Sequence, residues 1–255
     1  MPRGYFSRRG YRFGRSRSSR RRRYGFKRRK ITSTALSHWG KTWKRPLTQG
    51  AFPTGFPDRM AVKLKYQQKL LLSVTAGVPR VQVFRGNDCF DPDFTGTGHQ
   101  PNGYDQWSAF YSYQTVVASS IRAQVYSSSS GLIPSGLEWV IFPATLSTTL
   151  SSGDVTNARE QVYAKWRTVQ AGFGTQLQAS IRSYMSTAKM AGCPPSAISD
   201  CVSAYTGPTT ASPSLAWYWH IYVNNIAEND SSDCIFDFEI DYYVIFTGRK
   251  NETQS

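Results

Sequence analysis

Side chains suited to acid–base or metal chemistry are few in this 255-residue chain. The histidines are His38, His99 and His220. His99 lies in a Gly- and Asp-rich stretch with Asp91, Asp93 and Asp105 nearby, a set that could hold a metal ion or form an acid–base pair. A loop organised by hydrogen bonds accounts for the same residues. His38 precedes the body of the protein and His220 alternates with apolar tryptophans, so we expect structural roles for both.

Known motifs of catalytic and cofactor-binding sites are incomplete or absent in this sequence. Gly96-Thr97-Gly98 and Gly172-Phe173-Gly174 lack the third glycine of a dinucleotide-binding loop, and there is no Gly-x-Ser-x-Gly nucleophile elbow. The cysteines form no CxxC pair, which argues against a zinc site and favours reduced thiols in an intracellular setting. They are Cys89, Cys193, Cys201 and Cys234. We therefore expect no enzymatic activity, no cofactor and no bound metal.

Phosphate binding is the chemistry that the sequence indicates most strongly. Residues 1–30 contain fourteen cations and no Asp or Glu. These candidate nucleic-acid-binding residues are Arg3, Arg8, Arg9, Arg12, Arg15, Arg17, Arg20, Arg21, Arg22, Arg23, Lys27, Arg28, Arg29 and Lys30. Arginine forms paired hydrogen bonds with phosphate and stacks on bases. Six aromatic side chains interleaved with these charges, among them Tyr5 and Phe26, suit stacking on unpaired bases.

This N-terminal arm is expected to be disordered until a polyanion neutralises it, because like charges repel and few apolar side chains are present. Binding would depend steeply on salt and little on base sequence. Arg20, Arg21, Arg22, Arg23, Lys27, Arg28, Arg29 and Lys30 also match a nuclear-import signal. A solvated tail without a partner and a mitochondrial transit peptide are alternatives, although the clustered arginines give no amphipathic helix. Sequence does not separate the import signal from nucleic-acid binding.

Charge divides the chain into an arm and a body. Residues 1–57 hold 17 of the 31 Lys and Arg and none of the 16 Asp and Glu, so residues 58–255 are close to neutral. We expect the arm at residues 1–30, an irregular lead-in at 31–57, one domain at 58–250 and a short tail at 251–255. A body of this size can bury one sizeable core. Without a run of 18 apolar residues or an apolar signal segment, neither membrane insertion nor secretion is expected.

Hydrophobic alternation predicts that the body is all-β. The predicted strands are residues 60–74, 81–84, 115–126, 138–142, 216–224 and 236–246, with one or two short strands in 178–190. A short helix is predicted at 104–111, because Tyr104, Trp107 and Tyr111 would share one face. Residues 86–103, 147–176 and 193–213 are predicted to be loops, with one helical turn near 158–165. These elements favour a single eight-stranded antiparallel jelly roll.

In a jelly roll the first and last strands lie side by side, which brings two charged faces together. The lysines are Lys63, Lys65 and Lys69, and the carboxylates are Asp237, Glu239 and Asp241. We predict cross-strand ion pairs between them, each contributing a few tenths of a kcal/mol if exposed. Such pairs would give these lysines a structural role and remove the need to assign them to a nucleic-acid site.

Four segments of the body also resemble those of a known protein family. The residues are Phe84-Arg85-Gly86-Asn87-Asp88-Cys89-Phe90-Asp91-Pro92-Asp93, Gly96-Thr97-Gly98-His99-Gln100-Pro101, Tyr104-Asp105-Gln106-Trp107 and, later, Ile181-Arg182-Ser183-Tyr184-Met185-Ser186-Thr187-Ala188-Lys189. Together with the arm they resemble capsid proteins of circovirus-like, Rep-encoding circular single-stranded DNA (CRESS-DNA) viruses. The similarity covers roughly residues 60–247.

The resemblance implies a jelly roll that assembles into a small icosahedral T=1 shell of ~60 copies. It implies that the arm packages a single-stranded DNA genome inside the virion and, earlier, binds host import factors that carry the protein to the nucleus. The long loops would make subunit or host-receptor contacts. It assigns no chemical role to residues 88–107. Two other functions stay open: a monomeric cellular nucleic-acid-binding β-sandwich protein, and a jelly-roll enzyme or lectin with a basic targeting tail.

Overall fold

The computed structural model describes residues 57–75, 78–127, 136–150, 155–169, 178–201, 204–226 and 231–251. The predictions for the arm and for most of the lead-in lie outside these residues. No helix among the described residues is long and apolar enough to cross a membrane.

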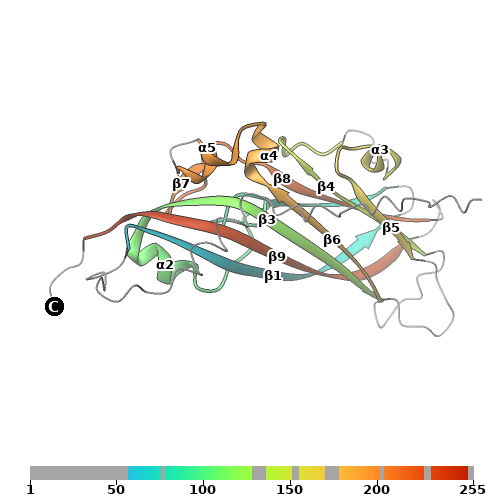
Figure 1. Cartoon of the computed structure of the whole chain (residues 1–255). Helices are drawn as coiled ribbons and strands as arrows, with labels where there is room; N and C mark the ends of the chain where they lie inside the picture. Colours follow the sequence, from blue (N-terminus) through green and yellow to red (C-terminus); the bar gives the residue numbers. More distant parts are fainter. Residues whose placement is uncertain are drawn as a thin grey trace, which may run out of the picture. The chain divides into compact units, whose positions relative to one another are not determined.

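Two antiparallel β-sheets form the body (Figure 1). The first sheet has the order β1-β9-β3-β6, and a short strand β7 also pairs with β3. Its strands are β1 (Arg59–Val74), β9 (Ser232–Arg249), β3 (Tyr111–Ser127), β6 (Gln178–Ser186) and β7 (Thr206–Pro208). The second sheet has the order β2-β8-β4-β5. Its strands are β2 (Arg80–Arg85), β8 (Tyr218–Asn225), β4 (Leu137–Ala144) and β5 (Lys165–Val169).

The pairing of the strands is nested. β1 pairs with β9, β2 with β8, β3 with β6, and β4 with β5, all antiparallel. The chain is therefore arranged as one long hairpin whose two halves are rolled together, and the first four strands, β1 to β4, alternate between the two sheets. This arrangement is a jelly roll. The predicted all-β fold and the predicted neighbourhood of the first and last strands are both confirmed.

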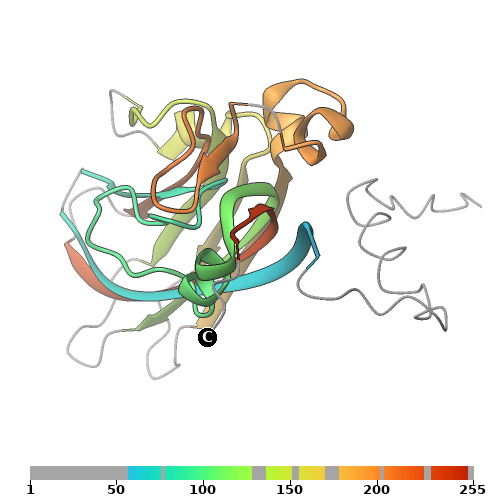
Figure 2. The same ribbon diagram turned by 90° about the vertical axis from the view of Figure 1, so that its left-hand side faces the viewer.

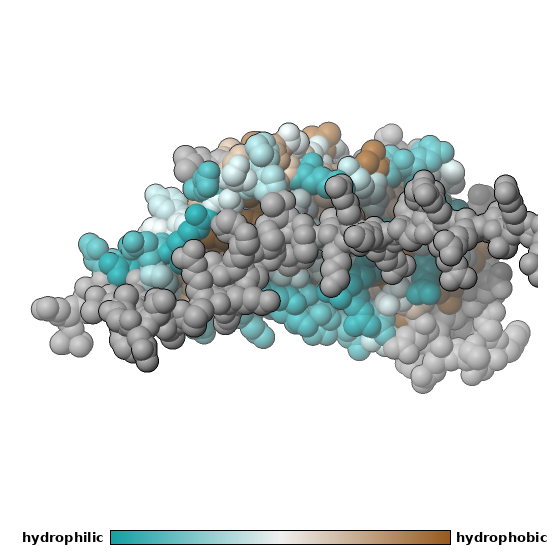
Figure 3. All heavy atoms as spheres, viewed as in Figure 1, coloured by the Kyte–Doolittle hydropathy of each residue, from teal (hydrophilic) through white to brown (hydrophobic). Residues whose placement is uncertain are grey.

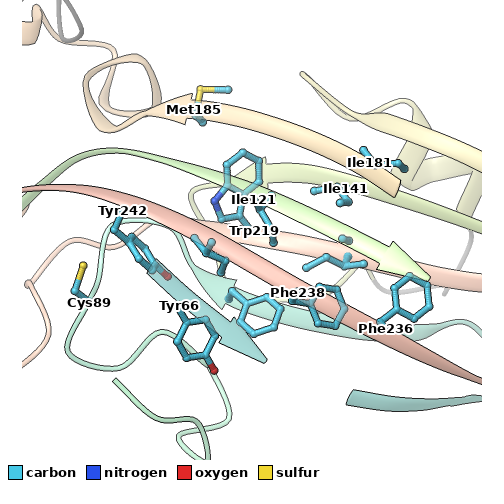
Figure 4. Packing of buried hydrophobic residues seen from close by; sticks show 14 of the residues in the cluster. Tyr66, Cys89, Ile121, Ile141, Ile181, Met185, Trp219, Phe236, Phe238 and Tyr242 are labelled. Carbon is cyan, nitrogen blue, oxygen red and sulfur yellow. The ribbon is translucent and has the colours of Figure 1, made fainter. Parts of the chain in front are cut away.

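The core lies between the two sheets (Figure 4). Phe238 of β9 contacts Phe84 of β2, with ring centroids 5.1 Å apart, and Phe236 contacts Trp139 of β4 at 5.9 Å. Both phenylalanines occupy even positions of the alternation that the sequence shows, and both are fully buried. Burying one such side chain contributes about 1.5–3 kcal/mol, so these contacts bind the sheets together.

Short helices cover parts of the outer faces. α4 (Thr187–Ala191) and α5 (Pro195–Ser199) lie next to each other in both views (Figures 1 and 2) and pack on Val117 and Ile245 of the first sheet. α3 (Val155–Arg159) packs on Val140 and Tyr222 of the second sheet. α2 (Tyr104–Phe110) precedes β3 directly, and this helix was predicted correctly.

Several elements differ from the sequence prediction. The predicted loop 147–176 contains α3, at residues 155–159 instead of 158–165, and the strand β5. Four of the five side chains of β5 are exposed, so it shows no alternation. The last four residues of the predicted strand region 178–190 belong to α4, which Ser186 caps by accepting a hydrogen bond from the backbone of Lys189. The predicted loop 193–213 contains α5 and β7.

Candidate functional site

The fourteen candidate nucleic-acid-binding cations and the import signal lie outside the described residues. Within the described residues, the arrangement most suited to binding a charged ligand is the outer face of the first sheet. α4 and α5 cover one part of this face with an apolar contact. The remaining part carries Lys63, Lys65 and Lys69 of β1, Asp237, Glu239 and Asp241 of β9, Arg122 of β3 and Arg182 of β6. We call this part the charged face.

Hydrophilic side chains gather over β1 and β9 in the space-filling view (Figure 3). Two of the predicted cross-strand ion pairs form there. The Nζ atom of Lys63 lies 2.9 Å from Oδ2 of Asp241, and that of Lys65 lies 2.6 Å from Oε1 of Glu239. The hydrogen bond and charge of Glu239 raise the pKa of Lys65, and Lys65 in turn lowers the pKa of Glu239. The prediction is confirmed for these two lysines.

The predicted ion pair of Lys69 is wrong. Lys69 stands opposite Asp237 in the ladder, but Asp237 accepts hydrogen bonds from Nε2 of Gln67 at 3.1 and 3.2 Å. The ammonium of Lys69 lies instead over the ring of Tyr126, 6.0 Å from its centroid. No carboxylate lies within ion-pair distance of Lys69 among the described residues.

Two arginines complete the charged face. Arg182 reaches Oδ2 of Asp241 at 3.4 Å, and Arg122 lies 4.0 Å from Glu239. Each of these carboxylates therefore lies between a lysine of β1 and an arginine from the other side. Neither arginine was singled out from the sequence. For Arg122 a signal was present, since it alternates with the apolar residues Ile121 and Ala123 of a predicted strand.

An open groove of about 560 Å³ lies along β1. Lys63, Lys65, Gln67, Lys69, His99 and Asn102 line it. We call it the β1 groove. The ring of His99 stacks on that of Tyr66, with centroids 4.7 Å apart. The chain thus brings a loop residue that the sequence marked for chemistry to three lysines that it marked for ion pairing.

Two of the three carboxylates proposed as partners of His99, Asp91 and Asp93, bind other residues. Asp91 forms an ion pair with Arg85. Asp93 accepts hydrogen bonds from the side chains of Gln68 and Gln82 and from the backbone of Thr95. Within the described ranges, no three His, Cys, Asp and Glu side chains are grouped so that they could hold a metal ion. The alternative interpretation, a loop organised by hydrogen bonds, describes these contacts.

The stretch of residues 84–107 that carries the family resemblance acts as an anchor in this structure. Asn87 accepts a hydrogen bond from the backbone of Trp217 at 2.8 Å and donates one to the carbonyl of Leu215 at 2.9 Å. Gly86 lies flat against the indole of Trp217, where a Cβ would overlap the ring. The loop after β2 is thereby fastened to the segment before β8.

His220 has the structural role expected of it. It is buried, stacks on Phe142 with centroids 5.2 Å apart, and its Nε2 lies 2.8 Å from the carbonyl oxygen of Leu146. Its position is on the outer face of the second sheet and not in the core between the sheets. Burial lowers the pKa of its imidazole, so it is neutral at pH 7.

No protein-family model matches the sequence, and no curated protein matches it. Solved structures of virus coats do match. A decameric BFDV capsid protein is 12% identical over 74% of this chain and 98% of that chain, with a TM-score of 0.41. Its 60-mer form is 12% identical over 78% and 100%, with a TM-score of 0.42. Mud crab tombus-like virus is 14% identical over 82% and 98%, with a TM-score of 0.44. Similarity at this level does not identify a function.

Proposed function

We propose that this chain is a viral capsid protein. Its jelly-roll bodies assemble into a closed icosahedral shell, and its arginine-rich arm packages a single-stranded DNA genome. The observation that carries the proposal is that one chain combines a near-neutral jelly-roll body with an N-terminal arm of fourteen positive charges in thirty residues. Jelly rolls are a common capsid architecture, and a polycationic arm with interleaved aromatic residues suits single-stranded nucleic acid.

Exposed apolar side chains on the body support self-assembly. The largest exposures among them are Leu146 and Val162, each 68%, and Leu71 and Val78, each 61%. Trp166 of β5 is 54% exposed on an edge strand. Aromatic side chains such as that of Trp166 are enriched in contacts between chains. In a closed shell, neighbouring copies would cover them.

The charge of the arm is of the right order for packaging. A shell of ~60 copies would enclose about 840 arm cations, a substantial part of what a genome on the order of two thousand phosphates requires. The same cations, from Arg20 to Arg23 and from Lys27 to Lys30, would direct the newly made protein to the host nucleus. Both uses are compatible, because import precedes packaging.

The test is electron microscopy with sedimentation on the full-length protein and on a chain without residues 1–30. We expect uniform closed particles from both, with nuclease-protected nucleic acid in the full-length sample only. A monomer that binds nucleic acid but never forms particles would contradict the proposal. It would favour the alternative of a cellular nucleic-acid-binding β-sandwich protein.

A further inference from the structure

We propose that the β1 groove is a second contact site for single-stranded nucleic acid, separate from the arm. The inference rests on the proposed function, since it takes the packaged strand as the ligand. It concerns residues of the body, which the sequence had assigned to structural ion pairs. Lys69 gives the first reason, because the structure leaves its charge without a carboxylate among the described residues.

The row of lysines has a spacing that suits a phosphodiester chain. Lys63, Lys65 and Lys69 are at odd positions of a single strand, so their side chains leave β1 on the same side. Alternate residues of a strand are about 7 Å apart. Successive phosphates of an extended nucleic-acid strand repeat at a comparable distance. A nucleic-acid strand lying along β1 could therefore place successive phosphates at Lys63 and Lys65, and a phosphate one repeat further on, past Gln67, at Lys69.

The lysines that already have carboxylate partners keep donors for a phosphate. An ammonium group has three N–H donors, and Lys63 and Lys65 each have one carboxylate partner in the structure. Their side chains are 44% and 56% exposed. Both lysines can therefore contact a ligand in the groove while they keep their ion pairs with the carboxylates of β9.

The arginines allow the lysines to turn away from β9 without leaving a carboxylate alone. If Lys63 turns toward the groove, Asp241 retains Arg182 at 3.4 Å. If Lys65 turns, Glu239 retains Arg122 at 4.0 Å. An unpaired buried carboxylate would oppose such a rearrangement, and at Asp241, whose side chain is 5% exposed, the second cation reduces that penalty. The charged face as a whole has five cations and three carboxylates, so its net charge attracts an anion.

The other side of the groove offers groups that bind bases. His99 lines the groove, and its ring is held against Tyr66. Aromatic rings of this kind stack on unpaired bases. Asn102 supplies an amide with both donors and an acceptor. Ammonium groups on one wall and an aromatic ring on the other favour a single strand over a duplex, whose bases face inward.

The test is lysine footprinting of the full-length protein. The protein is freed of nucleic acid in high salt, returned to low salt, and treated with an acetylating reagent with or without a single-stranded oligothymidylate. We expect acetylation of Lys63, Lys65 and Lys69 to fall several-fold when the oligonucleotide is present. Lys189, over the ring of Tyr163, and Lys250, bonded to the carbonyl of Ser108, serve as control lysines whose acetylation should not change.

A pair of variants measures the contribution to binding. Lys69→Gln should weaken oligothymidylate binding several-fold and reduce the slope of log K against log salt by about 0.7, the value for one lost phosphate contact. Lys250→Gln, the matched control, should leave both quantities unchanged. Equal effects of the two substitutions, or unchanged acetylation along β1, would overturn the proposal. Protection by heparin but not by the oligonucleotide would also overturn it and assign the groove to a sulfated polysaccharide.

These outcomes are separable from those for the proposed function. Particles that protect nucleic acid while the β1 lysines stay reactive would reject the groove alone. Protection of the β1 lysines in a protein that forms no particles would support the β1 groove as a nucleic-acid contact and contradict the proposed capsid function.

Discussion

Lys63 of β1 bonds to Asp241 of β9, although the residue directly opposite Lys63 in the ladder is Tyr243. The same diagonal step, two residues toward the N-terminus of β9, takes Lys65 to Glu239 and Gln67 to Asp237. For Lys69 the step leads to Ile235, which offers no charge. Lys69 therefore extends toward Tyr126, the residue that pairs with Ile235 on the next strand. One regular displacement explains both the ion pairs that form and the one that does not.

Asp241 is the carboxylate whose loss should cost most on the charged face. Its side chain is only 5% exposed and accepts from both Lys63 and Arg182, which are themselves partly exposed. We expect Asp241→Ala to lower the free energy of unfolding by about 1–2 kcal/mol, because two charge-assisted contacts are lost while the freed cations can be hydrated.

Denaturant unfolding at concentrations that prevent assembly would measure this change. The matched control is Lys65→Gln, which removes an exposed, solvent-screened pair and should lower the free energy of unfolding much less than Asp241→Ala does. Equal losses for the two variants would show that the buried position of Asp241 adds nothing.

Gly86 should be intolerant of any side chain. A Cβ at this position would overlap the indole of Trp217, which is fully buried and cannot move aside. Gly86→Ala should therefore cost about 3 kcal/mol or more and reduce the yield of folded protein. Gly192→Ala is a suitable control, because Gly192 has a φ of 66° but no atom within 4 Å of an added Cβ. Its cost should be about 1 kcal/mol, from backbone strain alone. Thermal unfolding of both variants would distinguish the two causes.

The sequence predicts the parts of this fold in which one face of a strand is buried. In β9 the apolar residues alternate without interruption and in β1 only Gln68 interrupts them, and both strands and their pairing were predicted correctly. β5 has no such pattern, since Lys165, Trp166 and Arg167 are all exposed and only pairing with β4 makes the segment a strand. α4 had a readable signal, with Ser186 as its N-cap and Gly192 after its end, within a segment otherwise taken as strand.

The candidate groove was less accessible to prediction. That Lys63, Lys65 and Lys69 share a face follows from their spacing, but the partner of each depends on the diagonal displacement, which alternation does not encode. His99 reaches β1 through the loop after β2, whose course depends on contacts such as that of Asn87 with Trp217. These contacts join residues 130 positions apart, and their pairing leaves no local pattern in the sequence.

His220 should make the stability of the body depend on pH. Burial lowers the pKa of its imidazole in the folded state, so the unfolded chain takes up a proton more readily. The stability that the neutral ring provides is present above the ordinary histidine pKa of about 6.5 and is lost as the pH falls through that value toward the lower pKa of the folded state.

Substitution of His220 by glutamine tests this dependence. Nε2 donates to the carbonyl of Leu146, and Nδ1 has no partner among the described residues, so a protonated ring would add a buried donor without an acceptor. His220→Gln retains a donor and removes the titration. We expect the variant to lose less stability than the original protein between about pH 7 and pH 5. Parallel curves from denaturant unfolding at each pH would show that His220 does not control this transition.

The arm should depend on guanidinium groups and not on charge alone. Twelve of its fourteen cations are arginines, and a chain with lysine at those twelve positions retains the full charge. Counterion release depends on the number of phosphates neutralised, so the slope of log K against log salt for oligothymidylate should stay the same. Affinity at one salt concentration should fall on the order of tenfold, because lysine cannot form the paired hydrogen bonds with phosphate or stack its planar group on bases. A matched control changes only Lys27 and Lys30 to arginine, which should leave affinity equal or slightly higher. If the lysine arm binds as tightly as the original, net charge accounts for nucleic-acid binding, and the abundance of arginine must reflect another demand, such as recognition by import factors.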